Sequence, residues 1–519
     1  MSAPAHHPMT RVDHAWLRMD TDVNLMMIVG VWLLKPAITH RALTERVQTR
    51  LLKYPRFREK VVEGLIGTEW VEDTGFDIRR HVLRERIEPA PGQTLREALQ
   101  ARMGELASTP LDPAHPLWCF HLVEDYEGGS ASICRIHHCV GDGVALNSVM
   151  MSIADDGVTP PQIEHAGAHA GHPSGPGADA HEHHQGDWLA DELIRPLTGL
   201  TVKAIGAYGD ALVKSLQVLE HPLQSLLGLR NIAKDGGRLL SDAAEMALMP
   251  DDSRTSLKGH GNGRKQVAWC EPLPLDQVKA VGKALGASVN DVLISCVGGA
   301  IGRYLAEGGE QLPDQDIRAM VPVNMRPLEQ AWQLGNRFGL VPLLVPVGTL
   351  APLDRLKLVH HRMNALKTGY QPLLSYGLLG LSGLLNETAQ KALSSLFLDK
   401  TTAVMTNVPG PQQPIHFCGA EVTQSIFWVP ASGDVGMGVS IISYAGGVQF
   451  GLITDEALCP EPREIIDRFS EEFEQLLWLA LMLPWPAGVP RPAHLEAQGP
   501  AGQAAKARRK GPPRGRGSR

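Results

Sequence analysis

Apolar runs and polar segments alternate along most of the chain, and their spacing predicts both strands and helices. In the first part of the chain, apolar residues follow one another closely from Val23 to Lys35, which is typical of a buried strand. Mixed strands and helices without a repeated strand–helix period indicate a layered α/β or α+β domain. Further strands are predicted at 61–72 and 131–137, and helices at 41–52, 94–106 and 144–154.

A second mixed segment extends from about Gln266 to Met482. Residues 438–444 and 447–453 flank a Tyr-Ala-Gly-Gly turn and predict a hairpin. A chain of 519 residues exceeds what one hydrophobic core usually organises, so two domains are expected. The segment also predicts a helix at 289–305 and strands at 317–323, 339–347 and 403–407.

The composition divides the chain further. Residues 157–187 are rich in Gly, Pro, Ala and His, and such a segment cannot bury enough apolar surface to offset its ordering entropy. It is predicted to be a disordered linker, and its histidines lack regular metal-ligand spacing. The Leu-rich stretch 188–250 is predicted to be a helical connector. These segments separate an N-terminal half (1–156) from a C-terminal half (251–490), and a basic disordered tail (491–519) follows.

The distribution of charge argues against one class of partner. The net charge is -7, although the last fifteen residues, Ala505 to Arg519, carry seven Arg or Lys and no acid. The body is therefore acidic, which argues against nucleic-acid binding, while the tail suits an anionic membrane surface.

Seven scattered cysteines without a CxxC pair argue against a disulfide framework or a zinc site and favour a reducing cytoplasm. No metal site is predicted.

The chain shows no pattern for export or for crossing a membrane. Its N-terminus lacks the basic region and apolar run of a signal peptide. The longest apolar runs fall short of the ~20 residues that span a bilayer. We therefore expect a protein that does not cross a membrane, although it can still lie on one.

The stretch Ile133 to Ala145, ICRIHHCVGDGVA, carries the candidate chemistry. Adjacent residues on a strand point to opposite faces, so His137 and His138 cannot share one role. One can face a cleft while the other supports the turn. A histidine titrates near neutrality and is therefore suited to take a proton from an attacking hydroxyl. The alternative is that both are satisfied surface groups at a strand end.

The turn after the histidines contains two glycines and an acid. Gly141 and Gly143 are expected to permit a tight strand-to-helix turn without Cβ clashes. Asp142 can orient His138 directly, or it can pair with a distant Arg and hold the turn. The short loop favours the second geometry. The plainer alternative for Asp142 is an N-cap of the following helix.

HHCVGDG matches the HHxxxDG motif of the coenzyme-A-dependent acyltransferase superfamily, and the chain resembles the bacterial wax ester synthase/diacylglycerol acyltransferase family. The resemblance extends from about Asp13 to Leu483, with the His-rich linker and the basic tail outside it. It implies two chloramphenicol-acetyltransferase-like α/β domains around a central active-site tunnel. Further segments occur in the family's order: WLRMD at 16–20, PLW at 116–118, ND at 290–291, VPVNMR at 321–326, GNRFG at 335–339 and NVPGP at 407–411.

The resemblance also implies roles within the motif. His138 corresponds to the general base, and His137 orients the strand end. Asp142, followed by Gly143, corresponds to a structural aspartate held by an arginine of the other half. Arg326 is the candidate for that arginine, and the alternative is an exposed strand-end cation.

Other residues are implied to support the site. Asn290 and Asp291 would line the active-site region, and they also suit an N-cap and the helix dipole, which is compatible. Thr406 or Asn407 would supply a hydrogen-bond donor to the oxyanion of a tetrahedral intermediate, and the alternative is a satisfied turn residue. The segment Pro116-Leu117-Trp118 would line a substrate pocket, and plain core packing is the alternative.

The implied reaction joins fatty acyl-CoA, as co-substrate, to a long-chain alcohol or diacylglycerol, without any cofactor. His138 would remove the hydroxyl proton, and direct attack on the thioester would give wax ester or triacylglycerol. The alternatives are a condensation-type enzyme with a carrier-bound acyl donor and a non-catalytic lipid-droplet coat. We expect a cytoplasmic monomer or homodimer, peripheral to the inner membrane or lipid inclusions. Contact with the membrane would use the apolar segment Leu373 to Leu398 or the basic tail.

Overall fold

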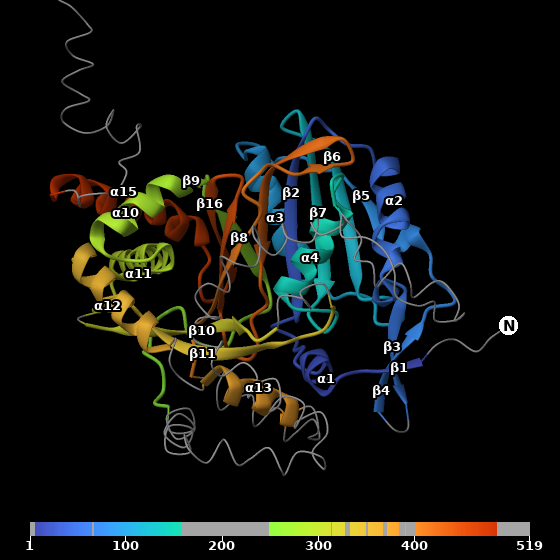
Figure 1. Cartoon of the computed structure of the whole chain (residues 1–519), viewed down its shortest axis with the longest axis horizontal. Coiled ribbons are helices and arrows are strands. Elements are labelled where there is room, and N and C mark those ends of the chain that lie inside the picture. Colours follow the sequence, from blue (N-terminus) through green and yellow to red (C-terminus); the bar gives the residue numbers. More distant parts are fainter. Residues whose placement is uncertain are drawn as a thin grey trace, which may run out of the picture.

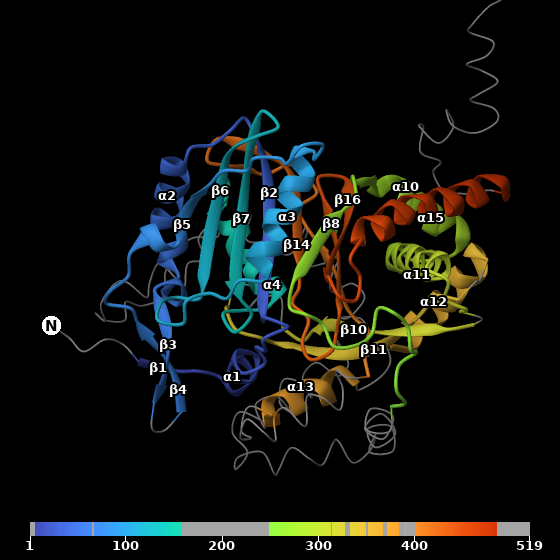
Figure 2. The same ribbon diagram turned by 180° about the vertical axis from the view of Figure 1, so that it is seen from behind.

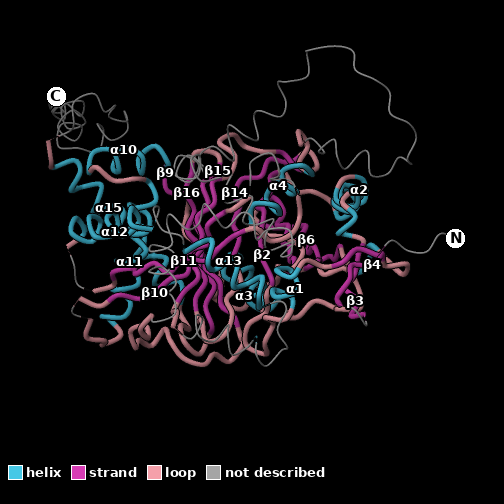
Figure 3. Tube along the Cα trace, turned by 60° about the horizontal axis from the view of Figure 1, so that its bottom comes forward, coloured by secondary structure: helices cyan, strands magenta, loops and turns pink. Residues whose placement is uncertain are grey.

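Two sheets stand side by side at the centre of the computed structural model, and each is the core of one lobe (Figure 1). In Figure 3 the strands of both sheets fill the middle of the molecule, and helices α10, α11, α12 and α15 gather on one side. The structure describes residues 6–64, 67–157, 249–312, 314–326, 333–348, 351–366, 371–382, 390 and 400–484.

The N-terminal lobe has a six-stranded sheet in the order β13-β14-β2-β7-β6-β5. Its pairs are antiparallel except β5 with β6. The strands are β2 (Met27–Lys35), β5 (Val82–Glu85), β6 (Trp118–Tyr126), β7 (Gly129–His137), β13 (His416–Phe417) and β14 (Ala420–Trp428). The helices are α2 (His40–Thr49), α3 (Leu95–Ala107) and α4 (Gly143–Ile153), with 3-10 turns at Leu51–Lys53, Pro55–Phe57 and Ile78–Arg80.

The C-terminal lobe has a seven-stranded sheet in which β11-β10-β12-β15-β16-β8 are neighbours and β9 also pairs with β16. Strand β12 runs parallel to β10 and β15, and the other pairs are antiparallel. The strands are β8 (Lys265–Trp269), β9 (Leu273–Pro274), β10 (Asp316–Asn324), β11 (Phe338–Pro346), β12 (Ala403–Pro409), β15 (Met437–Tyr444) and β16 (Gly447–Asp455). The helices are α10 (Leu275–Leu285), α11 (Val289–Glu307), α12 (Pro352–Leu366) and α15 (Pro462–Met482).

Smaller elements complete the fold around the lower edge in Figure 1. Helix α13 (Gln371–Ser382) packs against β11 and against α1 (Arg11–Leu17). Strands β1 (His6–Pro8), β3 (Glu59–Gly64) and β4 (Gly67–Glu72) form a separate three-stranded sheet. Among the described helices, no single one has the length and apolar composition needed to cross a bilayer. Helices α10 and α11 have that length and composition only when taken together, and they are bent by 96° relative to each other.

The C-terminal half of the chain contributes strands β13 and β14 to the N-terminal sheet. Between β12 and β15 the chain leaves the C-terminal lobe, and β14 pairs with β2 in the N-terminal sheet. Figure 2 shows β14 beside β2 at the junction of the lobes. The N-terminal sheet is therefore built from segments of both halves of the chain.

Most predicted elements are present, and one prediction is wrong. The hairpin is β15–β16, and α3, α4, α11, β7, β10, β11 and β12 lie within two residues of the predicted bounds. The single strand expected at 61–72 is instead the β3–β4 hairpin, because the chain reverses between Gly64 and Gly67, where Gly67 has φ 147°. Most of the predicted linker and connector, the basic tail and part of 373–398 lie outside the described residues.

Candidate active site

The motif occupies the end of β7, and its second histidine is enclosed by aromatic rings from both lobes. The His138 ring stacks on Trp16 of α1, with ring centroids 4.4 Å apart and planes at 21°. Phe338, at the start of β11, lies 5.5 Å away. The His138 amide donates to the Met26 carbonyl at 2.6 Å. The imidazole is therefore held in one orientation by packing on two sides.

Burial changes the titration of this ring. It lowers the pKa of His138 to about 4, although the negative charge of Asp142 acts in the opposite direction. The imidazole is therefore neutral near pH 7 and can accept a proton. Its Nδ1 is buried and has no hydrogen-bond partner among the described residues. A buried polar atom in that state calls for a functional explanation, and a substrate hydroxyl is one.

His137 lies on the other face of the strand and has partners within the turn. The Cys139 amide donates to its Nδ1 at 3.1 Å, and its Nε2 lies 3.3 Å from Asp20 Oδ1. In this pattern Nδ1 accepts a hydrogen bond and Nε2 is placed to donate one. The same Asp20 oxygen accepts a hydrogen bond from the Met26 amide. His137 and Asp20 thus fasten the strand end to the segment after α1.

Asp142 joins the two lobes. Its Oδ1 accepts from the Ala145 amide at 2.9 Å and caps α4, while Oδ2 pairs with Arg326 at 2.7 Å. The Arg337 amide donates to the same Oδ2 at 3.0 Å. Both side chains of the ion pair are buried. The expected pairing of Asp142 with Arg326 is therefore present, and so is the helix cap that was its alternative.

The segment 335–337 wraps around the motif. Gly335, which has φ 102°, forms a parallel bridge with Gly141. Asn336 Nδ2 donates to the His138 carbonyl and to Asp13 Oδ1, both at 2.8 Å. Asp13 of α1 is buried, and burial raises the pKa of its carboxyl. Asp13, Asn336 and the motif turn therefore form one connected polar unit.

The prediction that the two motif glycines avoid Cβ clashes holds for Gly141 but not for Gly143. Neither Gly141 nor Gly143 has a positive φ, so the backbone conformation does not require glycine there. At Gly141 an added Cβ would lie 3.3 Å from Leu334 and 3.5 Å from the Gly335 amide nitrogen, so the close approach of the second lobe favours glycine. At Gly143 an added Cβ would meet no atom within 4 Å. That position instead leaves space open beside the site.

The open space belongs to an apolar pocket between the lobes, which together with the open solvent at its mouth takes up about 780 Å³. One wall is the face of β2 and β7 that carries Ile136, two residues before His138. The lining residues are Ile28, Gly30, Val31, Trp32, Ser132, Cys134, Ile136, Gly143, Leu146, Asn147, Met150, Val408, Ser425, Ile426, Phe427, Val429 and Ile442.

Protein-family comparison adds a decisive observation. A family model described as wax ester synthase/diacylglycerol acyltransferase catalytic domain matches residues 9–293, which is more than half of the chain. A second one, described as WS/DGAT C-terminal domain, matches residues 334–477. The chain belongs to the wax ester synthase/diacylglycerol acyltransferase family.

Individual relatives agree with this assignment. The chain is 25% identical over 458 residues to a probable diacylglycerol O-acyltransferase of Mycobacterium tuberculosis, covering 86% of this chain and 90% of that protein. It is 25% identical over 485 residues to the O-acyltransferase WSD of Acinetobacter baylyi, covering 90% and 96%. These matches extend across both lobes.

Solved structures show the same fold. The wax ester synthase/diacylglycerol acyltransferase from Marinobacter aquaeolei VT8 matches with a TM-score of 0.59 at 20% identity, covering 91% of this chain and 99% of that one. The first condensation domain of the CDA synthetase matches with a TM-score of 0.52 at 15% identity, covering 92% and 97%. The expected two-lobed, chloramphenicol-acetyltransferase-like architecture is confirmed.

In this member of the family, the two candidate oxyanion donors lie on opposite faces of β12. Asn407 faces the helices, because its Nδ2 donates to Asn290 Oδ1 of α11 at 2.7 Å. Thr406 shares its face with Val408, which lines the apolar pocket. Its register partner in β15 is Ser440, whose hydroxyl is buried without a partner in the described part of the chain. Two hydroxyls therefore lie side by side on the pocket face.

The Asn290-Asp291 pair stands at the N-terminus of α11. Ser288 and Asp291 form a capping box. Asp291 Oδ2 also lies 2.7 Å from His360 Nδ1 of α12. Both residues therefore make contacts on the helix side of the C-terminal sheet, as the capping alternative predicted.

The segment Pro116-Leu117-Trp118 packs in the core of the N-terminal lobe. The buried Trp118 indole donates to the Phe57 carbonyl at 2.9 Å and stacks on His81. None of the three residues lines the apolar pocket. Plain core packing, the alternative given for this segment in the sequence analysis, accounts for these contacts.

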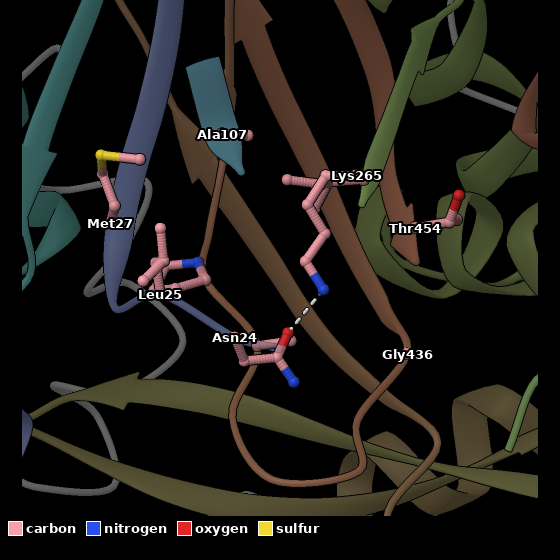
Figure 4. Close-up of a pocket in the computed structure, with 10 residues that line it drawn as sticks. Asn24, Leu25, Met27, Ala107, Lys265, Gly436 and Thr454 are labelled. Atoms are coloured by element: carbon pink, nitrogen blue, oxygen red, sulfur yellow. Dashed lines mark hydrogen bonds between the residues drawn. The ribbon is translucent and has the colours of Figure 1, made fainter. Parts of the chain in front are cut away.

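A second, smaller cavity lies on the opposite face of β2 (Figure 4). Lys265 Nζ donates to Asn24 Oδ1 at 2.7 Å and pairs with Asp455 at 3.1 Å. Asn24 in turn donates to the Gly433 carbonyl at 2.6 Å. These polar groups satisfy one another and join the lobes, so we assign this cavity a structural role.

Sequence reasoning missed Asp13 and Ser440. Asp13 follows the helix cap Thr10 by three residues, so it carries the sequence pattern of an ordinary helix start. Ser440 stands within an apolar strand and has no motif around it. Only the strand register reveals that Ser440 lies beside Thr406.

Proposed function

We propose that this family acyltransferase transfers a fatty acyl group from acyl-CoA to a long-chain alcohol or diacylglycerol, forming wax ester and/or triacylglycerol. The observation that carries the proposal is a buried, neutral His138 imidazole in the turn between Ile136 and Gly143, two residues that line an apolar pocket. A neutral imidazole supplies the base, and an apolar pocket suits a hydrocarbon chain.

In the proposed mechanism His138 removes the proton from the acceptor hydroxyl. The oxygen attacks the thioester carbonyl, and the new C–O bond forms while the carbonyl electrons move to oxygen. Collapse of the tetrahedral intermediate breaks the C–S bond, and the imidazolium returns its proton to the coenzyme A thiolate. The acyl group passes directly to the acceptor, so no covalent acyl-enzyme forms.

The proposal is tested by following thiol release from palmitoyl-CoA with and without hexadecanol or diacylglycerol. Release that depends on the acceptor, together with a matching ester product, supports the proposed reaction. A lipid-droplet coat would release no thiol. An enzyme that needs a carrier-bound donor would release none from palmitoyl-CoA but would react with the acylated carrier.

The pH profile of kcat/KM is expected to retain its activity as the pH falls from about 8 to about 5. The active form of His138 is the neutral one, and its pKa is lowered to about 4, so activity is lost only as the pH falls through that value. Initial rates with circular dichroism at each pH would check this. An acidic limb centred near the ordinary histidine pKa in a folded enzyme would contradict it.

Thr406 is the proposed oxyanion donor, because it lies on the pocket face and Asn407 does not. Thr406→Val keeps the shape and removes the hydroxyl, and we expect kcat to fall by about 10²-fold with KM little changed. Asn407→Ala, which breaks the contact with Asn290, serves as the control and should lower stability more than kcat. Wild-type kcat in Thr406→Val would move the donor role to Ser440.

Peripheral contact with a membrane or lipid droplet remains part of the proposal. Within the described part of the apolar segment, α13 contacts β11 and α1, and most of its described side chains are half-buried. The basic tail is the second sequence feature suited to an anionic surface.

A further inference from the structure

Exposed apolar side chains gather at the C-terminal end of helix α15. Among the described residues, five large apolar side chains are exposed, and three of them lie together here: Trp478 (46% exposed), Met482 (81%) and Leu483 (44%). We call these three residues the α15 end patch. Figures 1 and 2 show this end of the helix at the outer edge of the C-terminal lobe. Exposed apolar side chains that gather in one place mark an interaction site, whereas isolated ones do not.

The outward face of α15 changes its character along the helix. Its other face packs against α11. The next exposed positions of the helix after Gln475 are Trp478 and Met482, which are four residues apart and therefore neighbours on the helix surface. A helix that only covers a core keeps a polar outward face, so core packing does not explain the last turns. Before these positions, every exposed residue of α15 is polar: Arg463, Glu464, Asp467, Glu471, Glu474 and Gln475.

The sequence that continues from the patch has the composition of a lipid-contact segment. Residues 476–490, LLWLALMLPWPAGVP, contain no charged side chain and include a second tryptophan, Trp485. From Arg491 to Arg519 there are eight Arg or Lys and one acid. Tryptophan and leucine favour the boundary between headgroups and acyl chains, and basic residues are attracted to anionic headgroups. The apolar patch and the basic residues after it therefore complement the surface of an anionic bilayer.

The acidic residues of α15 determine how the helix can meet such a surface. Glu471 and Glu474 are exposed, and anionic headgroups would repel them. Glu474 lies eight residues before Met482, which corresponds to ~12 Å along the helix axis. Apolar residues at a bilayer interface sit ~5–10 Å deep, so the end of the helix can insert while both carboxylates stay in water. The helix therefore meets the surface with its end rather than along its length.

We propose that the α15 end patch inserts into the surface of an anionic phospholipid bilayer, and that the basic residues of 491–519 add an electrostatic attraction. The inference rests on the membrane contact included in the proposed function and gives that contact a place in the fold. It does not depend on the transfer reaction. Salt screens the attraction of the basic residues but leaves apolar burial intact, so the patch makes the larger contribution at high salt.

The test is flotation of the full chain with vesicles of phosphatidylglycerol and phosphatidylcholine. The double variant Trp478→Glu, Met482→Glu should lower the partition coefficient by about tenfold or more at both low and high salt. The reason is that it removes apolar burial and adds charges that the headgroups repel. A chain ending at Pro490 should bind more weakly than the wild type at low salt and equally well at high salt.

Val62→Glu is the matched control, because it places the same carboxylate at an exposed apolar position of β3 (38% exposed). Strand β3 and helix α15 lie on opposite sides of the molecule in Figure 1, so this variant should float as the wild type does. Circular dichroism and thermal unfolding show that each variant is folded.

Three results would overturn the proposal. The first is a wild type that does not float with these vesicles. The second is a double variant that floats as well as the wild type, and sedimentation would then show whether the patch joins two copies of the chain instead. The third is stronger flotation of the chain ending at Pro490, which would mean that the removed residues cover the patch.

Flotation and catalysis can fail separately. His138→Ala should float as the wild type does, since the base belongs to the motif turn and not to α15. If the wild type floats through the patch but transfers no acyl group from palmitoyl-CoA, the proposed function fails and the lipid-contact surface is retained. If the wild type transfers the acyl group but does not float, the surface fails and the function is retained.

Discussion

His138→Ala is expected to lower turnover by ~10²–10⁴-fold, which is the usual contribution of a general base. The reason is that the acceptor hydroxyl then has to lose its proton to water within an apolar site. The measurement is kcat with saturating acyl-CoA and alcohol, together with circular dichroism to show that the protein is folded. Near wild-type turnover in this variant would falsify the proposed mechanism.

His137→Ala is the matched control, since it removes the neighbouring imidazole from the opposite face of the strand. It breaks the contacts with the Cys139 amide and Asp20 but leaves the ring stacked on Trp16 in place. We expect part of the activity to remain. Equal losses in the two variants would show that the turn matters as a unit rather than through one base.

Asp142→Ala is expected to lower the free energy of unfolding by about 3–5 kcal/mol, because it leaves the Arg326 guanidinium buried without its counter-charge. The helix cap at Ala145 is lost in the same variant. Activity should fall with stability, since the carboxylate also fixes segment 335–337 against the motif. Denaturant unfolding measures the stability change.

Two comparisons sharpen this test. Asp354→Ala removes the carboxylate of an exposed ion pair with Lys357 and should change stability by less than about 1 kcal/mol. The double variant Asp142→Ala, Arg326→Met should lose less stability than the two single variants added together, because no buried charge is left unpaired. An additive result would mean that the ion pair contributes nothing beyond its separate side chains.

The motif region could be predicted from the sequence because its information is local. Alternation along β7 assigns opposite faces to His137 and His138, and the structure shows different partners for each. The pairing of Asp142 with Arg326 was expected from the family resemblance, since the two residues lie far apart in the chain. The ring that stacks on His138 belongs to Trp16, which the resemblance placed in a motif without a role.

Other features of the fold and the site depend on contacts between segments that are far apart in the sequence, and a local sequence pattern does not predict such contacts. The choice between Thr406 and Asn407 as oxyanion donor depends on which face of β12 packs against the helices. The position of α11 in the fold decides this, because Asn407 donates to Asn290 of that helix. The split of 61–72 into two strands was missed because apolar residues continue on both sides of the turn. Strand β14 was not predicted at all, since its partner β2 comes from the other half of the chain.

The position of β14 in the N-terminal sheet also constrains how the protein is made. The first lobe to leave the ribosome cannot complete its sheet, because one neighbour of β2 is residues 420–428. Until that segment emerges, β2 presents a long unpaired edge of largely apolar residues, which is a template for pairing with other chains. A nascent N-terminal lobe is thus exposed to misassembly for most of the time of synthesis. An isolated fragment ending near residue 157 should therefore aggregate, and a C-terminal fragment that carries β14 should rescue its solubility when the two are co-expressed.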